Sequence, residues 1–313
     1  MGRLRVGHLS TFYHTAVVMM AGEDVSGRLG ATVEWKLYGT GPAIVEAFQR
    51  GDLDLAYIGL PPAIIGIDRG ARIVCIAGGH MEGTVISGRR GYRRFPDTGV
   101  LRDIIAQFAG KRIGVPGKGS IHDVILADCL ERFGLKGEVG VMNFAWADQV
   151  LEAVVKGEVE AAVGTPALAV AVGRYAGGHI LYPPSMLWPS NPSYGILAGK
   201  EVLERQRETV LAFLFLHEEA TAFLRERPAE ASRLISSYVG FVDEEFVLDT
   251  LRVSPKYCAQ LTDEYVASTM DFVRAMKRLG YIGRLPARHE IFDLSLIREA
   301  HPGRDHYGEG IRA

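Results

Sequence analysis

Cysteine is scarce in this sequence, and its spacing limits the chemistry it can support. Only Cys75, Cys129 and Cys258 occur, far apart and without a CxxC pair. An odd number of widely separated cysteines predicts neither a disulfide framework nor a cysteine-based zinc site. We therefore expect buried free thiols, no bound metal and no cofactor.

Long apolar runs and an excess of charge of either sign are also lacking. No run approaches the roughly 18 apolar residues that cross a bilayer. Lys and Arg total 35 and Asp and Glu total 37, which leaves a formal net charge of −2. The longest basic stretch lies at 89–94, so no extended positive field is available to hold DNA or an anionic membrane. We expect no nucleic-acid partner.

The N-terminus does not have the pattern of an export signal. Residues 1–5 are basic enough to open one, but His8, Ser10, Thr11 and His14 interrupt the apolar segment that should follow. We expect no leader within this sequence. An extracytoplasmic location, in the periplasm or at the cell surface, then requires a leader that was removed or that precedes Met1. The cytoplasm is the alternative.

The short motifs of common enzyme classes are missing as well. Residues 114–120 contain Gly-Lys-Gly-Ser without the GxxxxGK[ST] spacing of a phosphate-binding loop, and neither GxSxG nor HExxH occurs. No acidic pair has a spacing that argues for glycoside hydrolysis. We therefore name no catalytic residue.

What the chain does have is length, apolar content and an internal repeat. Its 313 residues exceed the size of most single cores and 48% are hydrophobic, so two lobes are expected. Similar segments recur in the same order at an offset of about 106 positions. The matched pairs are 5–7 with 112–114, 31–38 with 137–144, and 51–63 with 157–167.

Each copy of the repeat combines a helix end, a buried strand and a Gly-x-Pro stop. Gly51 and Gly157 stand where a helix ends and a left-handed residue is favoured. The apolar run after each glycine is typical of a buried parallel strand. The stops at 59–61 and 164–166 then end these strands. Two βαβαβ units follow, and ligands bind at the carboxyl ends of strands in such sheets.

The C-terminal third has a helical pattern. The proline-rich segment 181–192 is typical of a return connection between lobes, and a short strand follows at 194–198. Lys200–Arg227 has strongly helical spacing, and further helices follow through Leu279. The polar tail from Gly303 is expected to be poorly ordered.

Several of these motifs together resemble a known family. They are Gly110–His122, the two segments that run from Gly-[Asp/Glu]-x-[Asp/Glu] to Gly-x-Pro, Asn191–Gly195 and Ala220–Ala231. In this order they resemble the substrate-binding proteins of nitrate, sulfonate, taurine and bicarbonate ABC importers, a group related to the NMT1/THI5-like proteins. The resemblance covers the chain from Val6 to about Ile282.

The resemblance implies an α/β fold of the type II periplasmic-binding-protein kind. Each of two lobes would be a mixed, mostly parallel sheet flanked by helices, with extra helices at the C-terminus. Lobe one would comprise 1–86 and 195–313, and lobe two 87–194. Such lobes close on a small ligand by hinge motion. The implied partners are that ligand and a membrane ABC permease, and we expect a monomer.

In a two-lobed fold, loops from both copies of the repeat should line the ligand cleft. The candidates from lobe one are Ser10, Thr11, Tyr13, His14, Gly39, Thr40 and Leu60, and those from lobe two are Lys118, Gly119, Ser120, His122, Trp146 and Thr165. Hydroxyls and amides at helix N-termini favour an anion. Ser120 also suits a plain N-cap, and His122 a capping or packing role. Trp146 is expected to form a wall of the cleft.

Two further segments bear on the ligand. We expect Ala77–Thr84 to form the first crossing between lobes, with His80 and Glu82 as solvated hinge residues. The alternative places them in the cleft, where they would suit a positive or hydrogen-bond-donating ligand. The family's Glu-Pro-Trp after the second repeat strand is replaced by Gly164–Ala167, which argues against nitrate or bicarbonate and leaves sulfonates or heterocycles.

Two functional hypotheses follow from the resemblance. The first is a solute-binding protein that captures a small anionic or heterocyclic molecule, such as a sulfonate, nitrate or pyrimidine, for an ABC importer. The second is a cytosolic enzyme of the same fold, similar to THI5-like pyrimidine synthases or to chorismate dehydratase-like enzymes of the menaquinone pathway. The absent leader favours the second hypothesis, and the absent catalytic constellation favours the first.

Overall fold

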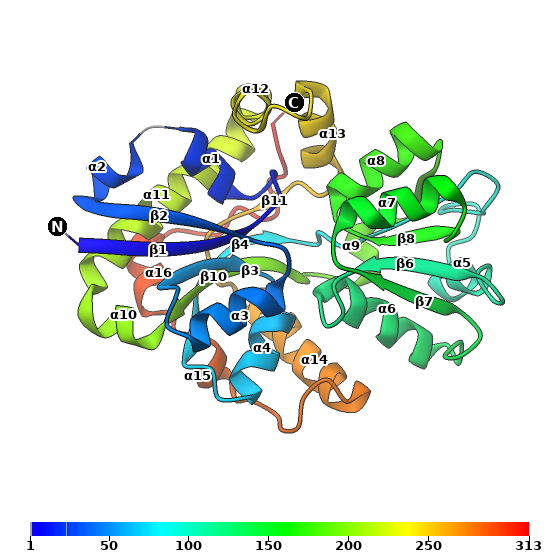
Figure 1. Ribbon diagram of the computed structural model, residues 1–313, viewed down its shortest axis with the longest axis horizontal. Helices are drawn as coiled ribbons and strands as arrows, with labels where there is room; N and C mark the ends of the chain where they lie inside the picture. The colour runs from blue at the N-terminus through cyan, green and yellow to red at the C-terminus, as the bar shows by residue number, and fades with distance from the viewer. Residues whose placement is uncertain (1, 23, 313) are drawn as a thin grey trace.

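The protein is an α/β molecule built on two sheets that lie side by side (Figure 1). The computed structural model describes residues 2–22 and 24–312. In the described part of the chain, no helix combines the length and apolarity needed to cross a membrane. Cys75, Cys129 and Cys258 are buried free thiols, which confirms that expectation.

The first sheet has the strand order β11-β4-β10-β3-β1-β2. Its strands are β1 (Gly2–Leu9), β2 (Ala31–Tyr38), β3 (Leu55–Ile58), β4 (Ile73–Met81), β10 (Pro192–Gly199) and β11 (Lys256–Tyr257). β1 pairs in parallel with β2 and β3. β10 runs antiparallel to β3 and β4, and β11 antiparallel to β4.

The second sheet has the order β7-β6-β8-β5-β9. Its strands are β5 (Val85–Gly88), β6 (Arg112–Pro116), β7 (Gly140–Phe144), β8 (Ala161–Gly164) and β9 (His179–Tyr182). β6 pairs in parallel with β7 and β8, whereas β5 is antiparallel to β8 and β9. The expected fold class is confirmed, and the parallel pairs between the named strands all lie in the strand trio that the repeat supplies.

The internal repeat determines how both sheets are built. The trio β2-β1-β3 of the first sheet corresponds to β7-β6-β8 of the second, in the same order. Each sheet then takes in one antiparallel strand, β10 or β5, between the trio and the strand that ends the repeat unit, β4 or β9. The two lobes therefore share one topology. Each takes its inserted antiparallel strand from the chain just after it crosses from the other sheet.

The chain passes between the sheets twice. It leaves the first sheet after Met81 and enters the second at Val85, then returns between Tyr182 and Pro192. The predicted lobe boundaries at 86/87 and 194/195 fall inside β5 and β10. The segments that connect the two sheets are therefore 82–84 and 183–191, and the Gly83 amide of the first donates to Ser193 Oγ in β10.

Helices cover both sheets, and the C-terminal ones bridge the lobes. The helices within the two repeat units and their connections are α1 (Thr15–Ala21), α2 (Val25–Leu29), α3 (Gly41–Gln49), α4 (Leu60–Asp68), α5 (Leu101–Ala106), α6 (Ile121–Arg132), α7 (Ala147–Lys156), α8 (Pro166–Ala176) and α9 (Pro184–Leu187). The C-terminal helices are α10 (Lys200–Arg205), α11 (Arg207–Glu226), α12 (Pro228–Val239), α13 (Glu244–Val253), α14 (Asp263–Leu279), α15 (Arg288–Ile291) and α16 (Ser295–Ala300). α13 packs on α8, and α14 packs on α6.

Two C-terminal expectations need correction. The helical pattern over 200–227 is broken at Gln206, whose φ of −137° separates α10 from α11. The tail from Gly303 is packed, because Tyr307 is buried and its hydroxyl donates to the Gln260 carbonyl. The Gly303 carbonyl also accepts from Gln260 Nε2, and the Arg312 amide donates to the Arg225 carbonyl, so the tail is held at several points despite its polar composition.

Candidate functional site

A cleft with a cavity volume of about 110 Å³ lies where the helices of both repeat units begin. Its lining comes from both lobes and includes Gly83, between the two sheets, and Ser193, near the start of β10. The lining residues are Leu9, Ser10, Thr11, Tyr13, His14, Gly39, Thr40, Gly41, Pro42, Gly59, Pro62, Gly83, Pro116, Gly117, Ser120, Ile121, His122, Ala145, Trp146, Ala147, Thr165 and Ser193.

Equivalent helix N-termini of the two lobes meet at this cleft. The N-cap residues are His14, Thr40 and Gly59 for α1, α3 and α4, and Ser120, Trp146 and Thr165 for α6, α7 and α8. All six line the cleft. The first amides of a helix have no partner within the helix and carry its positive dipole end. The cleft is therefore surrounded by hydrogen-bond donors and partial positive charge.

The hydroxyls of the capping residues already make hydrogen bonds within the protein. The Thr40, Ser120 and Thr165 hydroxyls accept from the amides three residues on, at 3.4, 3.3 and 3.1 Å. Ser120 Oγ also donates to the Pro116 carbonyl at 2.8 Å. Its one proton is thus already used, so at Ser120 the donors left for a ligand are the backbone amides that follow.

Two buried histidines point a ring nitrogen at the cleft. His14 Nδ1 bonds to Thr11 Oγ1 at 2.8 Å, and His122 Nδ1 bonds to Thr84 Oγ1 at 2.9 Å. Neither Nε2 has a hydrogen-bond partner among residues 2–22 and 24–312. When each threonine hydroxyl donates to Nδ1, the ring proton lies on Nε2 and serves as a donor for a ligand.

Burial keeps both imidazoles neutral. It lowers the pKa of His14 well below its usual value, and it lowers the pKa of His122 to about 4. The His14 ring also packs on Tyr194, with centroids 3.9 Å apart. At neutral pH these residues can therefore donate hydrogen bonds to a ligand without contributing a formal charge.

Trp146 joins the two lobes across the cleft. It is the N-cap residue of α7, and 39% of its side chain remains exposed. Its indole lies directly over Gly39 of lobe one. Gly119 of lobe two similarly approaches Ile65 of α4. The lobes are therefore in contact, and the Trp146 side chain is part of the cleft lining.

The side chains that line the cleft carry no formal charge at neutral pH. Among the described residues that line it, none is Lys, Arg, Asp or Glu. A ligand must be held by helix ends, hydroxyls, neutral imidazoles and apolar surface. No carboxylate is present there to hold a cationic group.

Three of the predicted residues lie outside this lining. Leu60 has no exposed surface, because its side chain belongs to the core. The Gly119 amide donates to Asp123 Oδ2 at 2.8 Å and so faces back into α6. Lys118 lines a separate groove beside α6 and Tyr281. The other predicted residues are brought together around the cleft.

The expectation for His80 and Glu82 is wrong in both of its forms. Both side chains are buried, and neither lines the cleft. The Glu82 carboxylate accepts from the Ser190 amide and from Lys256 Nζ, each at 2.9 Å. His80 Nε2 bonds to the Ser254 carbonyl at 2.7 Å. These residues form a polar network that ties the hinge to the C-terminal part.

Comparison with known proteins gives the family. The sequence profile of the NMT1-like family matches residues 2–239. The chain belongs to the NMT1-like family. A search of curated proteins finds no match to this NMT1-like sequence.

Solved structures similar to this NMT1-like protein share its fold at low sequence identity. The alkanesulfonate-binding protein SsuA of Xanthomonas axonopodis pv. citri, bound to MOPS, has a TM-score of 0.75 at 18% identity, covering 92% of this chain and 96% of its own. The periplasmic aliphatic sulphonate-binding protein SsuA of Escherichia coli has a TM-score of 0.78 at 18% identity, with 94% and 93% covered. The periplasmic nitrate-binding protein NrtA of Synechocystis PCC 6803 has a TM-score of 0.74 at 16% identity, with 96% and 89% covered.

Some lining residues of this NMT1-like protein were not predicted. Gly59 was recoverable, since the repeat aligns it with Thr165. Pro116 and Gly117 stand in the loop that was predicted to face the cleft, but they carry no hydrogen-bonding side chain. Gly83 and Ser193 reach the cleft only because β10 inserts beside β4, which no local signal reveals.

Proposed function

We propose that this protein is a solute-binding protein that captures a small organic anion, of alkanesulfonate type, in the interlobe cleft and presents it to a membrane ABC permease. The observation that carries the proposal is the convergence of helix N-termini from both lobes on one cleft, where none of the described lining residues is acidic. Oxyanions suit such a site because amides and helix dipoles both favour negative charge.

The energetics favour an anion held by many weak donors. A single helix N-terminus contributes about 0.3–1 kcal/mol at an exposed site and up to about 2 kcal/mol when partly buried. Several such ends acting together, with His14 and His122 as donors, match the three oxygens of a sulfonate. No lysine or arginine is needed, which agrees with the near-neutral charge of the whole chain.

Size and apolar surface limit the rest of the ligand. A cavity of about 150 Å³ holds a benzene molecule, and the cleft, at about 110 Å³, suits a ligand of similar or smaller size. Pro42, Pro62, Ile121 and the Trp146 indole supply apolar walls. A short alkyl or aromatic group on the sulfonate would contact them, and a small heterocycle would use the same walls.

Transport requires that the ligand change the relative stability of open and closed lobes. A ligand that contacts helix ends of both lobes binds the closed form more tightly and so shifts the population toward it. The closed form would present the surface that the permease recognises. We also propose an extracytoplasmic location, to be tested by cell fractionation, and a monomeric state, to be tested by light scattering.

The test is a ligand panel on freshly purified protein, after native mass spectrometry for anything already bound. Thermal shift and calorimetry would compare short alkanesulfonates, taurine, nitrate, bicarbonate and a neutral pyrimidine. We expect alkanesulfonates to bind most tightly and taurine more weakly, since no carboxylate meets its ammonium group. A hundredfold excess over Kd should stabilise the fold by about 2.7 kcal/mol. Pyrimidine binding without sulfonate binding, or turnover of any ligand, would overturn the proposal.

A further inference from the structure

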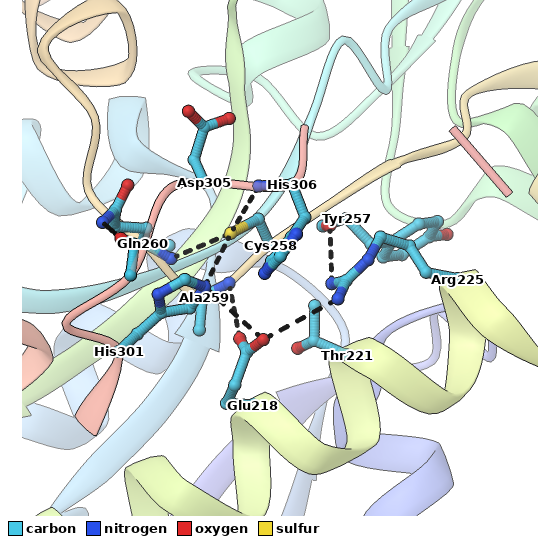
Figure 2. Close-up of polar contacts among 12 residues, drawn as sticks. Glu218, Thr221, Arg225, Tyr257, Cys258, Ala259, Gln260, His301, Asp305 and His306 are labelled. Carbon is cyan, nitrogen blue, oxygen red and sulfur yellow. Dashed lines mark hydrogen bonds and ion pairs between the residues drawn. The ribbon is translucent and has the colours of Figure 1, made fainter. Parts of the chain in front are cut away.

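Three potential metal ligands lie together in lobe one, away from the cleft. Glu218 comes from α11, Cys258 follows β11, and His301 follows α16 (Figure 2). The carboxylate, thiol and imidazole atoms all lie within 4.8 Å of one another. Cys258 and His301 are buried and Glu218 is partly buried. We propose that Glu218, Cys258 and His301 form a binding site for a zinc-type divalent metal ion.

The spacing of the ligand atoms fits tetrahedral coordination. Cys258 Sγ lies 3.6 Å from His301 Nε2, and His301 Nε2 lies 3.6 Å from a Glu218 oxygen, Oε1. With Zn–S, Zn–N and Zn–O bonds of about 2.3, 2.05 and 2.1 Å, a tetrahedral angle separates S from N by about 3.6 Å and N from O by about 3.4 Å. The sulfur and the carboxylate oxygen lie within 4.8 Å of each other. Side-chain shifts of up to about 1 Å would bring them to the roughly 3.6 Å of a tetrahedral site. Water or a further side chain would fill the fourth position.

Backbone amides already hold two of the ligands in place. The amides of Gln260 and His306 both donate to Cys258 Sγ at 3.4 Å. The amide of Ala259 donates to Glu218 Oε2 at 3.2 Å, which leaves Oε1 facing His301. Hydrogen bonds to sulfur favour its thiolate form, and outer-shell bonds of this kind orient ligands in metal sites.

A catalytic triad does not fit the same three residues. Both contacts of His301 fall on one nitrogen, Nε2. A nucleophilic Cys–His–Glu arrangement needs the thiol on one ring nitrogen and the carboxylate on the other, so that the base is oriented while it accepts a proton. Two ligands facing one nitrogen are instead arranged around a common point, as coordination to one ion requires.

Charge and ligand type point to the class of ion. A bound dication would deprotonate the thiol, and the thiolate and carboxylate would together balance its charge. Arg225 Nη2 forms an ion pair with Glu218 Oε1 at 3.9 Å, so this guanidinium and a bound dication would share the carboxylate. One sulfur and one imidazole favour zinc or cobalt over magnesium or calcium.

The ion would connect three segments that are far apart in sequence. Cys258 lies beside β4, where its amide donates to the Gly79 carbonyl at 3.2 Å. His301 begins the tail that Tyr307 anchors. Metal binding would therefore fix the tail and the β11 segment to α11 and stabilise lobe one. The cysteine spacing gave no sign of this site, since it has only one cysteine.

Cobalt provides a direct probe. Protein stripped with a chelator would be titrated with Co²⁺, and we expect saturation near one ion per chain with a thiolate-to-cobalt charge-transfer band and visible bands of tetrahedral cobalt. Zn²⁺ should displace the cobalt and raise the midpoint of thermal unfolding. Cys258→Ala should abolish the charge-transfer band, and His301→Gln and Glu218→Gln should each weaken cobalt binding by about tenfold or more.

The controls keep the proposal falsifiable. Cys75→Ala removes another fully buried thiol that is not part of the cluster, and it should leave the cobalt spectrum unchanged. Far-ultraviolet circular dichroism would show that each variant is folded before metal is added. Wild-type protein that shows no charge-transfer band, or a Cys258→Ala variant that keeps it, would overturn the proposal. Ligand binding in the cleft should persist in stripped protein, so the two proposals fail separately.

Discussion

The indole of Trp146 lies so close to Gly39 that a β-carbon on Gly39 would come within 2.7 Å of the indole Cζ2 atom. Because Gly39 follows β2 in lobe one and Trp146 follows β7 in lobe two, this contact reports directly on the distance between the lobes. It also explains why a glycine is needed at a position whose backbone does not demand one. Changes at either residue should therefore alter the cleft rather than the cores.

Gly39→Ala should displace the indole and weaken ligand binding. We expect about a tenfold or greater rise in Kd, measured by calorimetry, with the free energy of unfolding changed by about 1 kcal/mol or less. Gly99→Ala is the matched control, because an added β-carbon there meets no atom within 4 Å. If Gly39→Ala binds ligand as wild type does, Trp146 does not form the wall of the site.

Acid should destabilise the protein through its buried histidines. Burial lowers the pKa of His80, His122 and His217 to about 4. Between about pH 6.5 and 4 the unfolded chain binds protons that the folded protein does not, so stability is fully present above this range and falls as the pH drops through it. The loss approaches about 3 kcal/mol per histidine at the acid end.

Urea unfolding at several pH values in this range would measure the effect. His122→Gln should reduce the slope of stability against pH, whereas His289→Gln, at an exposed histidine, should leave it unchanged. A wild-type stability that stays constant from about pH 6.5 to 4.5 would contradict the assignment.

Arg174 connects lobe two to the C-terminal helix α13. It pairs with Asp243 at 2.8 Å, Glu245 at 3.4 Å and Asp249 at 3.5 Å, and α13 is anchored on lobe one through Phe246 and Phe12. Partly exposed pairs contribute about 0.2–1 kcal/mol each. Arg174→Gln should therefore favour open lobes and raise the ligand Kd by about two- to fivefold.

High salt should reproduce part of this effect in the wild type, because screening weakens exposed pairs. Arg227, the N-cap residue of α12, pairs with Glu230 in the first turn of the same helix, so Arg227→Gln serves as the control. Equal Kd values for Arg174→Gln and Arg227→Gln at low salt would show that the α8–α13 contact does not govern closure.

Removing only Lys256 from the Glu82–Lys256 ion pair should cost more stability than removing the charges of both residues. Glu82 is buried in the hinge network, so Lys256→Met leaves its carboxylate without a cation. We expect a loss of about 3 kcal/mol in urea unfolding, because an unpaired buried charge is costly. The double variant Glu82→Gln/Lys256→Met should recover much of that loss. A double variant no more stable than the single one would contradict this account.

The sequence predicted those features that depend on local pattern. The glycine-ended helices and the strands after Gly51 and Gly157 recur because each repeat unit specifies its own turn and strand chemistry. Thr40 and Thr165, which were predicted from the same local pattern, each follow a strand, cap a helix and line the cleft.

Features that depend on long-range packing were not predictable in this way. Leu60 begins α4 directly after the cleft-lining residue Gly59, but its side chain turns into the core. Glu82 meets Lys256 only because β11 pairs with β4. Glu218 and His301 meet Cys258 through the packing of α11 and the tail, which no spacing of residues indicates.

The most direct test of the central claim is the fluorescence of Trp146 during ligand titration. The chain has three tryptophans, so Trp35→Phe/Trp188→Phe leaves Trp146 alone at the cleft. We predict a saturable change in its emission as an alkanesulfonate is added, with the Kd that calorimetry gives for the same protein. Calorimetric binding without any change in Trp146 emission would show that the ligand binds outside the interlobe cleft.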